Sequence, residues 1–138
     1  RKIFNLWQKI YEVFRVDDSN CSQVIFSTLS KWFVFIDTIN DEILPYLKLT
    51  VKNTEKSHNS YFIIEELERL VKNSPGYVGE LYIEMLNNEN FPTYKQEQIE
   101  NIVDSLYKFG ENGNAKIIGN LYRKKGLYFL NEISKKYE

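Results

Sequence analysis

The chain has few of the residue types on which catalytic and metal sites depend. Its 138 residues include one cysteine, Cys21, and one histidine, His58. A zinc site needs three or four ligands drawn from cysteine, histidine and carboxylates, and these two distant residues do not supply them. A serine or cysteine nucleophile would have to use His58 as its base, and no nucleophile elbow accompanies it. We therefore expect no enzymatic activity, no metal and no cofactor.

Charge and hydropathy exclude further classes of partner. The 18 basic residues balance 19 acidic ones, so the net charge is −1 and no positive surplus marks a nucleic-acid interface. No apolar run reaches the roughly 18 residues of a membrane span. A lone cysteine forms no internal disulfide, which favours a reducing compartment and predicts a cytoplasmic protein. The six glycines form no phosphate-binding loop, so no small-molecule ligand is evident.

What the chain does contain is a helical period. Apolar residues recur along most of it at the three- and four-residue spacing of amphipathic helices. Short turns separate these stripes, so neighbouring helices must fold back on one another. The pattern predicts one all-α domain, 1–138, with about eight helices in antiparallel pairs. The stripes that define them span residues 3–14, 25–36, 43–47, 63–71, 78–86, 99–107, 115–122 and 130–137.

The sharpest break in this pattern is Asn73-Ser74-Pro75-Gly76, where one stripe ends and the next begins almost at once. The Ser74 side chain is predicted to cap the second helix. Pro75 suits the first helical position, because its missing N–H costs nothing there. The break is therefore expected to set how two packed helices cross.

Three other segments are less regular. The polar stretch 50–60 is predicted to be the longest loop. The run 32–36 resembles a strand, but its flanks keep the helical period and we expect a helix. The charged residues of the fourth stripe are predicted to point outward without an acid–base role; they are Glu65, Glu66, Glu68 and Arg69.

Four glycines have structural interpretations. Gly110 and Gly126 each close a helical stripe, and Gly110 is predicted to be a left-handed C-cap. Gly79 and Gly119 fall inside helices, where each costs about 1 kcal/mol relative to alanine. Close helix packing is the expected compensation, with contact to a partner as the alternative.

The helix pairs recur at a regular distance. Their second members begin near residues 20, 59, 94 and 127, a spacing of roughly 33 to 39 residues that is typical of two-helix solenoid repeats. The individual residues repeat less well than the shape, so a HEAT-like helical repeat and an irregular helical bundle both stay open. In either case the predicted core includes Trp7, Leu29, Phe33, Leu67, Leu70, Leu81, Leu106 and Leu121.

Aromatic residues are unusually abundant, with 10 Tyr, 9 Phe and 2 Trp. Several tyrosines fall off the core stripes. Tyrosine is enriched at protein interfaces because it joins a rigid apolar ring to a polar tip. An alternative is that these residues cover the edges of thin helical layers. The candidate interaction surface consists of Tyr46, Tyr61, Tyr77, Tyr94 and Tyr128.

Two segments carry a family resemblance: "NSPGYVGELYIEMLNN" (73–88) and "QIENIVDSLYKFGENGNAKIIGNLYRKKGLYFLNEI" (98–133). They contain a Pro-started helix with a Leu-Tyr core and two further helices that end in glycine. This pattern resembles the C-terminal helical tails of large multidomain bacterial proteins, where helices follow a sirtuin-like or nucleoside-triphosphatase effector of defence type. It is similar to armadillo- and HEAT-like repeats as well. The resemblance implies a scaffold, because any effector enzyme would lie elsewhere in the parent protein.

The chain starts at Arg1 in residues that already fit a helix, so we expect a domain of a longer protein. The expected role is protein–protein recognition or self-association. The alternatives are a small helical enzyme or nuclease domain and a helical regulatory domain. A HEPN-type ribonuclease would need an arginine shortly before His58, and there is none. The neutral charge, with no recognisable basic helix-turn-helix, counts against a DNA-binding regulator.

Overall fold

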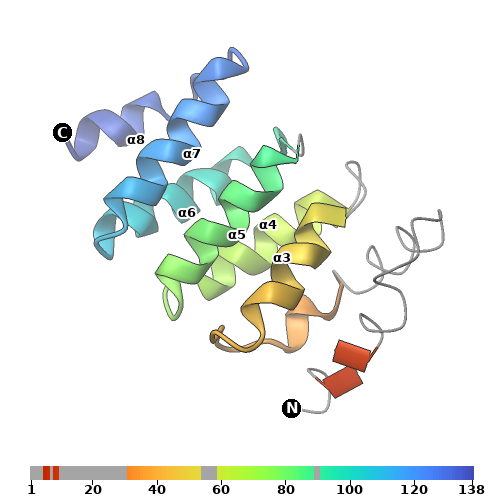
Figure 1. Ribbon diagram of the computed structural model, residues 1–138. Helices are drawn as coiled ribbons and strands as arrows, with labels where there is room; N and C mark the ends of the chain where they lie inside the picture. The colour runs from red at the N-terminus through yellow and green to blue at the C-terminus, as the bar shows by residue number, and fades with distance from the viewer. Residues whose placement is uncertain (1–4, 7, 10–30, 54–58, 89–90) are drawn as a thin grey trace.

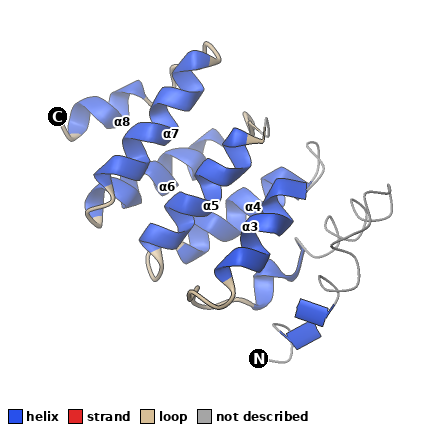
Figure 2. Cartoon of the chain, viewed as in Figure 1, coloured by secondary structure: helices blue, strands red, loops and turns tan. Residues whose placement is uncertain are grey.

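The computed structural model describes residues 5–6, 8–9, 31–53, 59–88 and 91–138, and every regular element in those ranges is helical (Figure 2). The all-α fold class is thereby confirmed. Of the eight predicted helices, the first two lie mostly outside these ranges. The described elements are a 3-10 helix, η1 (Lys31–Phe35), and six α-helices: α3 (Leu44–Asn53), α4 (Asn59–Leu70), α5 (Pro75–Asn87), α6 (Gln96–Lys108), α7 (Asn112–Lys124) and α8 (Asn131–Lys136).

The helices alternate between two layers along the chain. Helices α3, α5 and α7 pack side by side in one layer, and α4, α6 and α8 pack in the other, with η1 against α4 (Figure 1). Consecutive helices such as α4 and α5, or α6 and α7, pack across the two layers. Each pair of helices therefore stacks on the next pair, with the apolar core between the layers.

The connecting turns gather at two opposite edges of this stack (Figure 1). We name the first the Pro75 edge; it carries the turns 36–43, 71–74 and 109–111. We name the second the Tyr94 edge; it carries the described connections 91–95 and 125–130. The two edges therefore present different sets of turns to solvent.

Most of the predicted core residues are buried between the layers. Trp7 and Leu29 lie outside the described residues. Leu121 is partly buried and packs against the core, beside the fully buried Ala115, Ile118 and Tyr122 of α7. The predicted core residues found fully buried are Phe33, Leu67, Leu70, Leu81 and Leu106.

The turn between α4 and α5 has the predicted position but a different bonding pattern. Pro75 occupies the start of α5, and the Ser74 carbonyl accepts a helical hydrogen bond from the Val78 N–H at 2.9 Å. The Ser74 side chain makes no capping bond, so the predicted cap is wrong. Its hydroxyl oxygen instead accepts a buried hydrogen bond from the Ile39 N–H at 3.0 Å. Ser74 thus fastens the turn to the segment before α3.

The predicted loop 50–60 is shorter than expected, because α3 continues to Asn53. Thr50 and Val51 are both buried within that helix. The Thr50 hydroxyl donates to the Tyr46 carbonyl at 2.8 Å, which satisfies a polar group on the buried face. The prediction assigned Thr50 to a loop because the residue is polar, but its hydrogen bond to the preceding turn lets it lie on the buried face of a helix.

The strand-like run 32–36 is helical, as predicted, although the helix is of the 3-10 type. Phe33, Ile36 and Ile39 are buried, while Val34 and Phe35 are exposed. A three-residue spacing of buried positions fits a 3-10 turn, in which residues three apart lie above one another.

The predicted left-handed cap at Gly110 is confirmed, and Gly126 adopts the same conformation after α7. Gly110 has φ +84° and Gly126 has φ +79°, the left-handed region that favours glycine. After α6, the Glu111 N–H donates to the Leu106 carbonyl at 2.7 Å and the Gly110 N–H donates to the Tyr107 carbonyl at 3.2 Å. This pair of bonds is a Schellman motif, and it satisfies carbonyls that the helix end would leave unpaired.

The two glycines inside helices differ from each other. A Cβ atom on Gly79 would lie 2.6 Å from Asn114 Nδ2 and 2.9 Å from Asn114 Cβ, so α5 and α7 approach closely at this point. A Cβ on Gly119 would lie no closer than 3.8 Å to Arg123 or Ser134. The predicted packing requirement therefore holds for Gly79 and is wrong for Gly119, where alanine has room.

The charged stripe of α4 was predicted to point outward, and Glu66 contradicts that prediction because it is buried. Its Oε1 accepts from Arg69 Nε at 2.8 Å. Arg69 also donates to the carbonyls of Phe33 and Ile36, at 2.9 and 2.7 Å. The Glu66–Arg69 pair therefore fixes η1 and the segment after it to α4.

Candidate functional site

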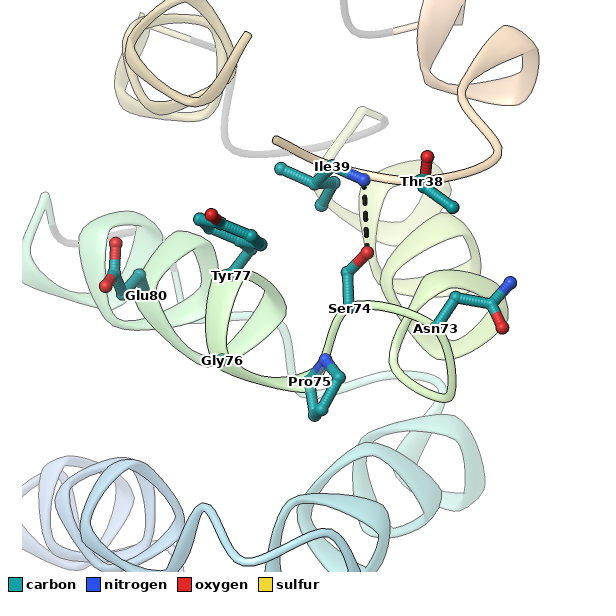
Figure 3. Close-up of a pocket in the computed structure, with 8 residues that line it drawn as sticks. All are labelled: Thr38, Ile39, Asn73, Ser74, Pro75, Gly76, Tyr77 and Glu80. Carbon is teal, nitrogen blue, oxygen red and sulfur yellow. Dashed lines mark hydrogen bonds between the residues drawn. The ribbon is translucent and has the colours of Figure 1, made fainter. Parts of the chain in front are cut away.

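A pocket opens at the Pro75 edge, beside the turn that separates α4 from α5 (Figure 3). Its volume is about 300 Å³. Pockets that bury small molecules begin near this size, so the space suits one side chain better than a cofactor. The lining comes from the segment before α3, the turn and the start of α5: Thr38, Ile39, Asn73, Ser74, Pro75, Gly76, Tyr77 and Glu80.

Tyr77 is held in place at this pocket. Its hydroxyl donates to Asp41 Oδ1 at 2.6 Å. That hydrogen bond is the main reason that the pKa of Tyr77 is raised, with desolvation and the nearby carboxylates of Asp41 and Glu80 adding to it. The phenol therefore stays protonated, and its ring has a fixed orientation on the pocket wall (Figure 3).

Carboxylates surround the pocket. Glu80 lines it and forms an ion pair with Lys48 at 3.3 Å. The Glu111 carboxylate lies against Gly76, since a Cβ built on that glycine would be 3.2 Å from Glu111 Oε1. Glu80 is thus the carboxylate that lines the pocket, while Asp41 is bound to the Tyr77 hydroxyl and Glu111 lies beside Gly76, so negative charge near the space would attract a cationic group.

The Tyr94 edge is aromatic. Tyr61 and Tyr94 meet edge to face, with ring centroids 5.1 Å apart, and Tyr94 is 69% exposed. Tyr128, in the turn after α7, is 61% exposed. Behind them, Tyr122 contacts both Phe91 and Phe129, at 5.4 and 5.2 Å between centroids. The inner rings join the two turns of this edge, and the outer rings face solvent.

Lysines accompany these rings. Lys125 Nζ lies 5.2 Å from the centroid of the Phe91 ring, a cation–π contact. Lys95 pairs with Glu65 at 2.5 Å and has φ +62°, which is a left-handed conformation uncommon for lysine. Lys124 is exposed at the end of α7. The Tyr94 edge therefore combines exposed tyrosines with positive charge.

The five predicted surface tyrosines do not form one patch. Tyr61 and Tyr94 touch each other, and Tyr128 lies at the same edge. Tyr77 belongs to the Pro75 edge. Tyr46, in the first turn of α3, is half-buried and packs against the core. Three of the five therefore lie at one edge, and one helps to line the pocket opposite.

A buried hydrogen-bond chain was missed by the sequence reasoning. Tyr82 and Tyr122 are fully buried, and their hydroxyl oxygens are 2.7 Å apart. The Tyr122 hydroxyl donates to the Pro92 carbonyl at 2.8 Å. A hydroxyl has one hydrogen, so Tyr82 must be the donor to Tyr122. Both tyrosines lie on predicted apolar stripes, and that position is the only signal the sequence carries for this chain.

Burial raises the pKa of both tyrosines in that chain. Desolvation is the main cause for Tyr82, and the nearby Tyr122 adds to it. For Tyr122, desolvation raises the pKa while the hydrogen bond from Tyr82 lowers it, and desolvation prevails. Both groups are neutral donors whose role is to hold the 91–95 connection against α5 and α7.

A second concavity, of about 410 Å³, lies between α4 and α6 and is lined by polar residues that include Arg69 and Asp104. Asp104 Oδ1 accepts from Lys136 Nζ at 3.0 Å and from the Tyr137 hydroxyl at 2.7 Å. Partial burial alone would raise the pKa of Asp104, but these hydrogen bonds outweigh it and the pKa is lowered. Arg69 and Asp104 are thus engaged in holding η1 and α8 in place.

The remaining candidates from the sequence, Cys21 and His58, lie outside the described residues. Within the described part of the chain, no three His, Cys, Asp or Glu residues are grouped closely enough to hold a metal ion. None of the described helices has the length and apolar character needed to cross a membrane.

The chain matches no protein-family model, no curated protein and no solved structure.

Proposed function

We propose that the chain is a non-catalytic helical scaffold that mediates protein–protein recognition or oligomerisation within a larger cytoplasmic protein. The observation that carries this proposal is the exposure of Tyr94 and Tyr128 at one edge. The same fold buries Tyr82 and Tyr122 completely, so it has the means to hide such rings. Exposed tyrosines in adjacent turns are typical of interfaces, where the rings lose little conformational entropy on binding.

The alternation of layers supports a HEAT-like helical repeat as the architecture of this scaffold. In such proteins each helix pair contacts mainly its neighbours, and the stack exposes long edges and faces to partners. Helix pairs of a longer parent protein would extend the same stack. The bacterial, defence-type context comes from the sequence resemblance alone and belongs to the proposal.

The engagement of the charged residues favours a scaffold over an enzyme. A catalytic acid or base needs a perturbed pKa and a path to substrate. Asp104 has a perturbed pKa, but its partners Lys136 and Tyr137 lie at the end of α8, which packs against α6. Arg69 is bound to Glu66 and to two backbone carbonyls. Asp104 and Arg69 therefore stabilise the fold through these contacts.

The test is a binding experiment with the parent protein. Tyr94→Ser and Tyr128→Ser remove exposed rings, and Ile117→Ser is the control, since Ile117 is exposed on α7 away from the turns. Sedimentation measures the binding of the chain to the remainder of the parent protein and its self-association. A thermal melt of each variant checks that it is folded. We expect the tyrosine variants to melt like the unmodified chain and to associate at least about tenfold more weakly. Unchanged association in both variants would refute the proposal.

A further inference from the structure

We propose that the Tyr94 edge of one chain binds the Pro75 edge of a second copy, so that copies join edge to edge. This inference rests on the proposed function and goes further, because it names the partner and both contact surfaces. It is carried by the opposite charges of the two edges and by the position of the pocket.

The charges of the two edges are complementary. Of the lysines in the described turns of the Tyr94 edge, Lys95 is paired with Glu65; Lys125 begins the turn after α7, and Lys124 immediately precedes it at the end of that helix. The turns of the Pro75 edge carry four acidic residues and a single basic one, Lys72. Opposite potentials on two surfaces speed their encounter and fix their orientation. The acidic residues are Asp37, Asp41, Glu42 and Glu111.

The shapes of the two edges are complementary as well. The pocket at the Pro75 edge offers the Tyr77 ring and the Ile39 side chain beside the polar groups of Asn73 and Glu80 (Figure 3). Tyr128 offers an exposed ring with a hydroxyl; Lys125 precedes it in the same turn and Lys124 is the last residue of α7. A tyrosine ring in the pocket would place those lysines beside the carboxylates that border it.

Helix dipoles do not account for all the lysines and exposed tyrosines of the Tyr94 edge. Lysines at the end of α7 complement the partial negative charge of a helix C-terminus, and this explains the position of Lys124. It does not explain why Tyr94 and Tyr128 are exposed in the same two turns. A polyanion such as nucleic acid would use the basic edge alone and would leave the acidic pocket without a role.

The geometry predicts the type of assembly. The two edges lie on opposite sides of the stack (Figure 1). Two copies joined through one pair of edges therefore keep one free edge of each kind. Such heterologous contacts generate open chains, or rings where the rotation closes, and do not stop at a symmetric dimer.

The experiment uses two charge-reversal variants and their mixture. Lys124→Glu/Lys125→Glu makes both edges acidic, and Asp41→Lys/Glu42→Lys makes both edges basic. We expect each variant alone to self-associate at least about tenfold more weakly than the unmodified chain in sedimentation velocity at low salt. Mixing the two in equal amounts restores association, because each variant then meets an edge of opposite charge.

The control is Lys116→Glu/Lys135→Glu. It changes the net charge by the same amount as Lys124→Glu/Lys125→Glu, but at exposed positions within α7 and α8 and away from the turns. It should associate like the unmodified chain. Thermal melts identify any variant that fails to fold, and Tyr128→Ser then tests the same edge without a charge change.

Each outcome decides the inference. Association that weakens as NaCl rises, is lost in both reversals and returns on mixing supports it. An unmodified chain that stays monomeric at every concentration and salt, a closed dimer, or reversals without effect overturns it. Binding of a labelled single-stranded oligonucleotide by the basic edge would overturn it too. In the first three of these cases the proposed scaffold role survives if the parent protein still binds through Tyr94 and Tyr128.

Discussion

The buried hydroxyl chain Tyr82–Tyr122–Pro92 allows a sharp prediction, because its two tyrosines play unequal parts. Tyr82 only donates, and its acceptor is the Tyr122 hydroxyl. Tyr122 accepts from Tyr82 and donates to the Pro92 carbonyl. Replacing either tyrosine with phenylalanine removes one oxygen atom and leaves the ring packing in place. The two substitutions should nevertheless differ in cost.

Tyr82→Phe removes one hydrogen bond and leaves Tyr122 bound to the Pro92 carbonyl, so it should cost about 1 kcal/mol. Tyr122→Phe leaves both the Tyr82 hydroxyl and the Pro92 carbonyl buried without partners, at roughly 1–3 kcal/mol each, so about 2–6 kcal/mol in all. The double variant should cost less than the sum of the two, because Tyr82 then no longer leaves an unsatisfied donor.

The assay is urea unfolding followed by circular dichroism, with the free energy of unfolding extrapolated to water for the four proteins. Equal losses for Tyr82→Phe and Tyr122→Phe, or strictly additive losses in the double variant, would refute the assigned direction of the chain. The raised pKa of both tyrosines adds a second readout. The stability that they contribute is complete below their ordinary pKa of about 10 and is lost as pH rises above it, and Tyr82→Phe/Tyr122→Phe should reduce that alkaline loss.

Three further predictions follow from single contacts. Ser74→Ala leaves the buried Ile39 N–H unpaired and should cost about 1–3 kcal/mol in urea unfolding; an unchanged midpoint would argue against that bond. Gly79→Ala forces a Cβ against Asn114 and should lower the free energy of unfolding by about 1–3 kcal/mol. Gly119→Ala has room and should raise it by up to about 1 kcal/mol. Melting temperatures that move in the same direction for both variants would contradict the close approach of α5 and α7 at Gly79. Asp104 has a lowered pKa, so its contribution is present above its ordinary pKa and is lost as pH falls below about 4. The unmodified chain should therefore be more stable than Asp104→Asn by on the order of 1 kcal/mol at pH 7 and lose that advantage at acid pH; a difference that is constant with pH would exclude an ionised role.

The sequence predicted the structural features that depend on residues close together in the chain. Apolar spacing located the helices from α4 to α7, and glycine conformations marked the ends of α6 and α7, because each depends on residues within one or two turns. The sequence predicted that close helix packing requires a glycine at position 79, but it did not identify Asn114 as the contacting residue. These features follow from the period of the helix and from backbone sterics.

Contacts between distant residues were not predictable in this way. Ser74 has the chemistry of a helix cap, yet its partner Ile39 lies 35 residues earlier, and only the packing of η1 and α3 makes that contact available. Glu66 sits among exposed charges in the sequence and becomes buried because Arg69 turns inward to bind backbone carbonyls. The division of the surface tyrosines between two edges likewise depends on helix alternation, which the sequence alone does not reveal.

The most direct test of the central claim compares hydrogen exchange in the isolated chain and in the assembled parent protein. If the turns of the stack are recognition surfaces, backbone amides in 91–95 and 125–130 should exchange at least about tenfold more slowly in the assembly. Amides within the buried faces of α5 and α6 serve as the internal reference and should change little. The account would be contradicted if the amides of both turns exchanged equally fast in the isolated chain and in the assembly, and only other parts of the stack became protected.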